Sequence, residues 1–139
     1  MAEASLYLLD TNLISHLMRE PKGVVAQRYT ALLKGPKPPR MVTSLVVQCE
    51  LLYGLAKTPS PRLHKAYDLQ LQQLPVLHLD EGLPSHYAAL RTQLERAGIA
   101  LGANDLLIAA HAIAVDATLV SADTAFARVP GLKVENWLN

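Results

Sequence analysis

The chain has 139 residues, of which 50% are hydrophobic and 18% charged, and its formal net charge is +1. This composition excludes a disordered chain, and the length predicts one domain, residues 1–139, that is large enough to bury a core. No apolar run is long enough to span a bilayer, the N-terminus lacks signal-peptide features, and no basic tract indicates nucleic-acid binding by itself.

In the first half of the chain, short apolar segments alternate with longer segments of helical character. The first apolar segment, SLYLLD, ends in Asp10 and predicts a buried strand that leads into a helix. Pro21 interrupts that helix, and Ser44 is a suitable N-cap for a later one. The predicted elements are strands at residues 5–10 and 41–44 and helices at 11–20, 24–34, 45–57 and 62–74, with a proline-rich loop at 35–40.

The second half of the chain continues this alternation. Strands that alternate with helices are typical of a parallel sheet that is covered by helices on both faces. We therefore predict an α/β protein with a three-layer α/β/α fold and a central parallel sheet. The predicted elements are strands at residues 75–79, 117–123 and 132–137, helices at 81–97 and 104–115, and a short helical segment at 124–129.

Four acidic residues stand out because no lysine or arginine lies within four positions of them on either side. Asp10 and Asp123 end predicted strands, Asp105 opens an apolar helix, and Glu50 interrupts another. The carboxyl ends of parallel strands and the helix starts beyond them share one edge of a sheet, where ligands bind. We expect Asp10, Asp105 and Asp123 at that edge, and Glu50 only if its helix lies across the crevice. Asp116 also lacks a basic neighbour, but it precedes a strand and belongs at the opposite edge.

Mutual repulsion makes such a group of acids costly. Two carboxylates about 4 Å apart repel by about 4 kcal/mol at an effective dielectric constant of about 20. Four of them in one cleft would either take up protons or bind a cation, unless each pairs with a distant lysine or arginine. Oxygen ligands without a histidine or cysteine cluster favour Mg²⁺ or Mn²⁺ over Zn²⁺, so we expect a site for one of these ions.

The segments that carry these acids resemble a known family. LLDTNLISHL, VTSLVVQCELLYGLAK, GANDLLIAAHAIAVDATLVSAD and FARVPGLKVENW occur in this order and are together similar to the PIN-domain ribonuclease toxins of bacterial VapBC toxin–antitoxin pairs. A piece such as LDTN is a weak signal alone, whereas the ordered set is specific. The resemblance implies a Mg²⁺- or Mn²⁺-dependent endoribonuclease whose catalytic, metal-binding acids correspond to Asp10, Glu50, Asp105 and Asp123.

The resemblance also implies partners and a substrate. It implies a homodimer that a cognate VapB-type antitoxin holds inactive in a hetero-oligomer, and a structured RNA target such as tRNA or rRNA whose cleavage inhibits translation and growth. Attack by water with metal assistance would leave a 5′-phosphate and a 3′-hydroxyl. A histidine-based ribonuclease would leave a cyclic phosphate, but no spacing pairs the five histidines. Asp123 acts either as a direct metal ligand or through a neighbouring group.

Other residues have both functional and structural interpretations. Asn12 and Ser121 could orient a bound water or ligand, or serve as turn and cap residues. We expect His111 in the core or an interface. Cys49 is interpreted as a small buried group, and as the single cysteine it is typical of a cytoplasmic protein. The candidates for RNA phosphate contacts are Arg19, Lys22, Lys34, Lys37, Arg40 and Arg128.

Two other functions fit part of the pattern. An aspartate-based phosphatase or phosphoacceptor domain would place its nucleophile at Asp10, but the DTN segment lacks the second carboxylate of a D-x-D motif, and no glycine-rich phosphate loop is present. A non-catalytic binding module with the same fold would have to tolerate four unpaired carboxylates without a metal ion.

Overall fold

The computed structural model describes residues 5–138. This part of the chain forms a five-stranded sheet, six α-helices and one short 3₁₀ helix. The strands are β1 (Leu6–Leu9), β2 (Arg40–Ser44), β3 (Val76–Leu77), β4 (Thr118–Val120) and β5 (Lys133–Glu135). The helices are α1 (Thr11–Arg19), α2 (Val24–Leu33), α3 (Leu45–Lys57), α4 (Pro61–Gln73), α5 (Leu83–Arg96), α6 (Ala103–Ala114) and the 3₁₀ helix η1 (Thr124–Arg128).

All strands of the sheet are parallel, and their order is β3-β2-β1-β4-β5. Leu8 of the central strand pairs with Val42 on one side and with Leu119 on the other. The chain therefore extends the sheet from β1 in one direction through β2 and β3, and in the other through β4 and β5. This reversal creates a topological switch point between β1 and β4, and a crevice opens there at the carboxyl ends of the strands.

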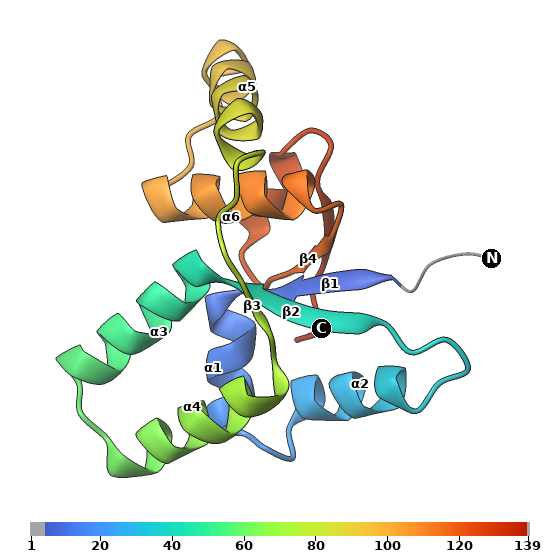
Figure 1. Cartoon of the computed structure of the whole chain (residues 1–139), viewed down its shortest axis with the longest axis vertical. Coiled ribbons are helices and arrows are strands. Elements are labelled where there is room, and N and C mark those ends of the chain that lie inside the picture. The colour runs from blue at the N-terminus through green and yellow to red at the C-terminus, as the bar shows by residue number, and fades with distance from the viewer. Residues whose placement is uncertain (1–4, 139) are drawn as a thin grey trace.

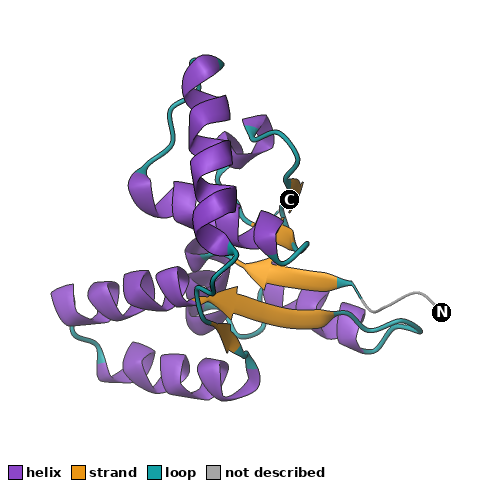
Figure 2. Ribbon diagram, turned by 45° about the horizontal axis from the view of Figure 1, so that its top comes forward, coloured by secondary structure: helices purple, strands orange, loops and turns teal. Residues whose placement is uncertain are grey.

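Helices cover both faces of the sheet, as predicted. Figure 1 shows α5 and α6 on one side of β1 and β2, and α1, α2 and α4 on the other. Helix α3 contacts both α1 and α6, so it lies where the two helical layers meet. Figure 2 shows the same separation around the strands from another direction. The three-layer α/β/α fold with a central parallel sheet is therefore confirmed, and α1, α3 and α6 all border its ligand-binding edge.

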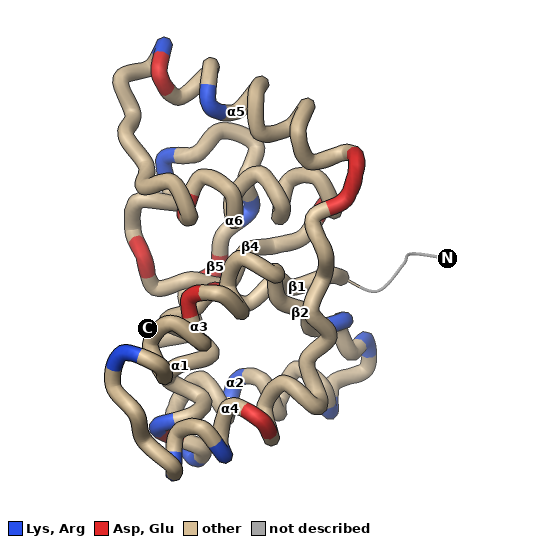
Figure 3. Tube along the Cα trace, turned by 60° about the vertical axis from the view of Figure 1, so that its left-hand side comes forward, with Lys and Arg blue, Asp and Glu red and all other residues tan. Residues whose placement is uncertain are grey.

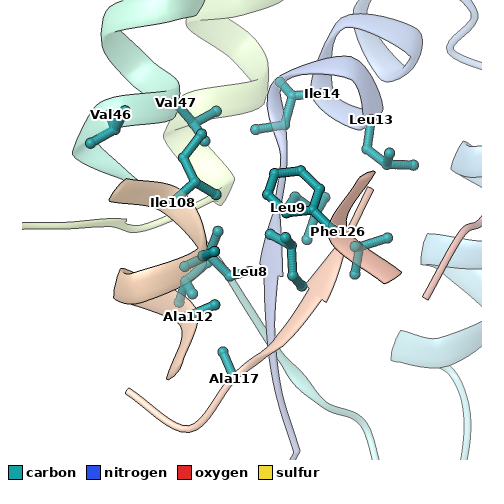
Figure 4. Packing of buried hydrophobic residues seen from close by; sticks show 14 of the residues in the cluster. Leu8, Leu9, Leu13, Ile14, Val46, Val47, Ile108, Ala112, Ala117 and Phe126 are labelled. Atoms are coloured by element: carbon teal, nitrogen blue, oxygen red, sulfur yellow. The ribbon is translucent and has the colours of Figure 1, made fainter. Parts of the chain in front are cut away.

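The core lies on both sides of β1. Leu8 and Leu9 are fully buried, and Figure 4 shows them among Phe126 of η1, Ile108 of α6 and Val47 of α3. Burying a side chain of this size contributes roughly 1.5–3 kcal/mol, so apolar contacts fix the positions of the surrounding helices. The acids that follow these strands are consequently attached to a rigid scaffold.

Most element boundaries agree with the sequence prediction, and one burial prediction was wrong. Four strands are shorter than predicted, because their terminal residues turn into caps and loops, whereas β2 begins one residue earlier, at Arg40. Cys49 is exposed rather than buried, since it lies on the outer face of α3 together with Leu52 and Tyr53. His111 is buried, as expected, and its Nδ1 atom lies 2.8 Å from Oγ of Ser44. Within residues 5–138, no helix is long and apolar enough to cross a membrane.

Candidate active site

Asp10 lies at the end of the central strand and caps the helix that follows. Its Oδ1 atom accepts a hydrogen bond of 2.8 Å from the backbone N–H of Thr11, and its Oδ2 atom accepts one of 2.7 Å from Oγ of Ser121. The residue is only 4% exposed. Burial raises the pKa of the Asp10 carboxyl, while these two hydrogen bonds lower it and the charges of Glu50 and Asp123 raise it further. Asp10 is thus a buried acid in a fixed orientation.

Glu50 reaches the same place from the middle of α3. Its Oε1 atom accepts a hydrogen bond of 2.6 Å from Oγ1 of Thr11, the residue that also donates its backbone N–H to Asp10. Thr11 therefore links the two acids, although they lie 40 positions apart in the sequence. Sequence reasoning missed this residue, because the DTN segment drew attention to its aspartate and asparagine only. The condition set for Glu50, that its helix must lie across the crevice, is met.

Ser121 and Asn12 organise the side of the site that β4 provides. The Oγ atom of Ser121 accepts a hydrogen bond of 3.1 Å from the backbone N–H of Asp123 while it donates to Asp10. Asn12 accepts a hydrogen bond of 3.1 Å from the N–H of Ala122, and its Nδ2 atom lies 3.5 Å from Oγ of Ser121. Asp123 in turn caps η1 by accepting from the N–H of Ala125. These contacts tie β4 to the start of α1 and fix Asp123 relative to Asp10.

Asp105 lies in the first turn of α6 and is the least constrained of the four acids. Among the hydrogen bonds within residues 5–138, none involves its carboxylate, in contrast to those of the other three acids. The pKa of Asp105 is raised to about 6, chiefly by burial and then by the charges of Asp10, Asp123 and Glu50. The carboxylate therefore experiences the uncompensated charge of the other three acids.

All four acids line one hollow of about 660 Å³. The ion pairs found in the described part of the chain join Arg28 to Glu135, Arg91 to Glu95 and Lys133 to Asp116, so none of them neutralises this group. Among the described residues that line the hollow, Arg19 is the only lysine or arginine. The residues that line it are Asp10, Thr11, Asn12, Ser15, His16, Arg19, Glu20, Glu50, Asp105, Asp123 and Leu138.

The donor set of this hollow fits a hard divalent cation. It offers carboxylate oxygens whose charges no ion pair within residues 5–138 neutralises, and burial together with the neighbouring acids raises the pKa of Asp105. No three histidine, cysteine or acidic side chains among residues 5–138 already stand together as a metal-holding group. Repulsion keeps bare carboxylates apart, so we expect their side chains to close around an ion only when one is present.

The remaining candidate residues are divided between the hollow and the surface. Arg19 lines the hollow, whereas Lys22, Lys37, Arg40 and Arg128 do not line it and are exposed. Lys34 is also exposed and lies beside a separate hollow between α1, α2 and α4. The hollow also includes His16, whose Nδ1 atom is buried and has no hydrogen-bond partner within the described residues. Neither the spacing of the histidines nor the charge pattern pointed to His16.

Comparison with known proteins agrees with this fold. The PIN domain profile matches residues 7–132. Ribonuclease VapC2 of Rickettsia felis is 34% identical over 95% of this chain and 98% of its own length, and the tRNA(fMet)-specific endonuclease VapC of Shigella flexneri is 31% identical over 94% and 97%. The structure of VapBC2 from Rickettsia felis bound to a promoter DNA fragment superimposes with a TM-score of 0.87, at 34% identity, over 95% of this chain and 98% of that chain.

These matches extend over nearly the whole chain, and the architecture agrees with them throughout. The five-stranded parallel sheet between helical layers is the α/β/α architecture of the PIN domain, and acids lie at the carboxyl ends of β1 and β4 and at the start of α6. The chain belongs to the PIN-domain family and, within that family, to the VapC ribonucleases.

Proposed function

We propose that this chain is the toxin of a type II toxin–antitoxin pair and that it hydrolyses RNA phosphodiester bonds with the help of Mg²⁺ or Mn²⁺. The observation that carries the proposal is the convergence of Asp10, Glu50, Asp105 and Asp123 on one hollow without an ion-pair partner among the described residues. A structural role for these acids would leave four charges uncompensated, which is costly for partly buried groups. A divalent cation removes that cost and provides nuclease chemistry.

The four acids have different parts in this proposal. Asp10, Glu50 and Asp105 would hold the cation, and Asp123 would either join them or act through Ser121 and Asp10. A bound divalent ion supplies charge neutralisation at the scissile phosphate and lowers the pKa of water. Thr11 holds Glu50 through its side-chain hydroxyl and Asp10 through its backbone N–H. Ser121 links Asp10 and Asp123, because its hydroxyl donates to the Asp10 carboxylate and accepts from the backbone N–H of Asp123. Asp105, which lacks such a constraint, is free to adjust to the ion.

Substrate and partners follow from the relatives. Two curated relatives carry names specifying tRNA(fMet), and several structural neighbours are toxin–antitoxin complexes. We propose a structured RNA such as tRNA or rRNA as the target, cut in an unpaired loop where the backbone is accessible. We further propose a VapB-type antitoxin as the inhibitory partner and a homodimer as the active form. A phosphatase is disfavoured, because the curated relatives of this chain are named as ribonucleases or endonucleases.

The central experiment is cleavage of bacterial total RNA by the purified chain with Mg²⁺ or Mn²⁺, followed by sequencing of the new 5′ ends. We expect discrete cuts that carry 5′-phosphates, a loss of cleavage with chelator, and recovery when Mg²⁺ is restored. Asp10→Asn should abolish cleavage, whereas Asp116→Asn at the far edge of the sheet should not. Cleavage that persists in excess chelator, or cyclic phosphate ends, would contradict the metal mechanism.

The proposed partners need separate tests. Light scattering of the purified chain should give the mass of a dimer. Co-expression with the product of the adjacent small open reading frame should yield a stable complex in which RNA cleavage is suppressed. A monomeric mass for the cleaving enzyme would contradict the homodimer, and undiminished cleavage in the complex would contradict the antitoxin.

A further inference from the structure

The near-neutral net charge conceals a strong separation of charge along the chain. Nine of the 13 basic residues lie between residues 19 and 65, but only two of the 12 acids do, so this span carries +7 and the remainder carries −6. The span covers the end of α1, α2, β2, α3 and the start of α4. Figure 3 shows basic positions gathered around α1, α2 and α4 in the lower half of the view. A polyanion therefore meets an attractive surface on one side of the acidic hollow.

A second hollow adjoins the first on this basic side. It has a volume of about 390 Å³ and lies in the groove between α1, α3 and α4. Both volumes are in the range of small-ligand pockets, about 300–1,000 Å³, so they suit an unpaired strand rather than a double helix. The two hollows are continuous, because four residues line both of them: Thr11, Ser15, Arg19 and Glu50.

Two basic side chains mark this continuous groove. Arg19 lies at the junction of the two hollows, and Lys57 lines only the second. Neither takes part in the ion pairs found within the described residues. The Nζ atom of Lys57 instead lies 5.9 Å from the ring centroid of the exposed Tyr53. Both cations are therefore exposed and available to an anionic ligand.

We propose that the RNA strand leaves the acidic hollow through the groove between α1, α3 and α4, with Arg19 binding a phosphate next to the scissile bond and Lys57 binding one further along. This inference rests on the proposed nuclease function. The acidic hollow is lined by five carboxylates, including Glu20, and repels phosphates other than the one at the metal site. Because the two cations lie on one side of the acids, they give the strand a direction of exit.

The test measures RNA binding by full-length Asp105→Asn protein, which is expected to bind without cutting. The probe is an end-labelled, mixed-sequence, unpaired oligoribonucleotide in the presence of Mg²⁺. Adding Arg19→Gln or Lys57→Gln should weaken binding about 3- to 10-fold and reduce the slope of log affinity against log salt by about 0.7, the value for one phosphate contact on a single strand. Arg96→Gln, which removes the same charge from α5, should change neither quantity, and Arg19→Lys should keep the slope.

The proposed path is overturned if Arg19→Gln and Lys57→Gln match Arg96→Gln in affinity and in salt slope. It is also overturned if a duplex of the same length binds as tightly as the unpaired probe. A loss of antitoxin binding with unchanged RNA binding would also overturn the path, and it would assign the groove to the antitoxin. Cleavage of total RNA by the wild-type chain is scored separately. A wild-type protein that cuts while both variants bind normally therefore refutes the path alone, and a wild-type protein that never cuts refutes the nuclease function.

Discussion

Replacing Asp105 by asparagine should separate the catalytic from the structural consequences of the acidic cluster. The pKa of the Asp105 carboxyl rises from 3.8 to about 6 in the folded chain, so its ionised form is destabilised there relative to the unfolded chain. A shift of about two units corresponds to roughly 3 kcal/mol as an upper bound. Because the group is only partly buried, solvent screening reduces this to about 1 kcal/mol. Asp105→Asn should therefore raise the free energy of unfolding by about 1 kcal/mol at pH 7 without metal, while it abolishes RNA cleavage.

The pH dependence of this effect has a definite sign. Below about pH 4 the carboxyl is protonated in both states and costs nothing. Between about pH 4 and 6 the unfolded chain ionises first, so the folded state binds more protons and loses stability as the pH rises. The advantage of Asp105→Asn should consequently be present at pH 7 and largely absent near pH 4. It should also shrink at pH 7 when Mg²⁺ is added, because the cation stabilises the wild-type carboxylate.

Urea unfolding in chelator, followed by circular dichroism at pH 4 and pH 7, measures both quantities. Asp116→Asn is the matched control, because it removes an exposed acid that pairs with Lys133 at the surface and should change stability by less than about 0.5 kcal/mol. A loss of several kcal/mol in Asp105→Asn with cleavage retained would refute the reasoning. It would mean that an internal basic group compensates this carboxylate.

Three further substitutions test the contacts around the acids. Ser121→Ala removes the hydroxyl that donates to Asp10, so cleavage or Mg²⁺ affinity should fall about 10- to 100-fold. Urea unfolding should show that the free energy of unfolding falls by about 1–3 kcal/mol, and cleavage at the wild-type rate would contradict the positioning role. Thr11→Val removes the hydroxyl that holds Glu50, so half-maximal cleavage should need about 10-fold more Mg²⁺, whereas an unchanged titration would exclude that role. The Nδ1 atom of His16 is buried and has no hydrogen-bond partner within residues 5–138, so His16→Leu should not lower the free energy of unfolding; a loss above about 1 kcal/mol would reveal a partner such as ordered water.

The sequence predicted the fold well because local and long-range signals agree in this chain. Short apolar strands, the cap at Ser44 and the proline at residue 21 each specify a boundary without reference to distant residues. The alternation of strands and helices then implies a parallel sheet. The strand order could not be derived in the same way, because it depends on which apolar faces pack together once the helices have formed. The family assignment, which rested on ordered motifs, is confirmed by the PIN domain match.

Prediction of the candidate site was less complete. The positions of Asp10, Asp105 and Asp123 follow from the topology, since strand ends and helix starts share one edge of the sheet. The position of Glu50 depends on how α3 crosses that edge, and the bond from Thr11 that fixes it joins residues far apart in the sequence. The metal-binding roles of the four acids stay a prediction.

The burial prediction for Cys49 was wrong, and the inference from the net charge was incomplete. Helix α3 is apolar on nearly every side, so its sequence does not reveal which face is buried, and Cys49 proved to be exposed beside Leu52 and Tyr53. The net charge of +1 led to the inference that no basic tract by itself indicates nucleic-acid binding. The charges are in fact segregated, with nine basic residues between residues 19 and 65. The position of charge along the chain is therefore more informative than its sum.

The placement of the acids explains how the chain can carry this cluster before a cation arrives. Asp10 caps α1, Asp123 caps η1, and Asp105 lies in the first turn of α6, so each carboxylate occupies a helix start. A helix N-terminus presents free N–H groups, and that of a full α-helix carries about half a positive charge, which favours a nearby carboxylate by roughly 0.3–1 kcal/mol. Glu50 lies inside its helix and has no such support, and it is the acid that receives a hydroxyl hydrogen bond from Thr11. The backbone N–H groups that offset the repulsion at Asp10 and Asp123 also fix the orientation of these two carboxylates, so a cation should bind to an already folded site rather than be needed to fold it.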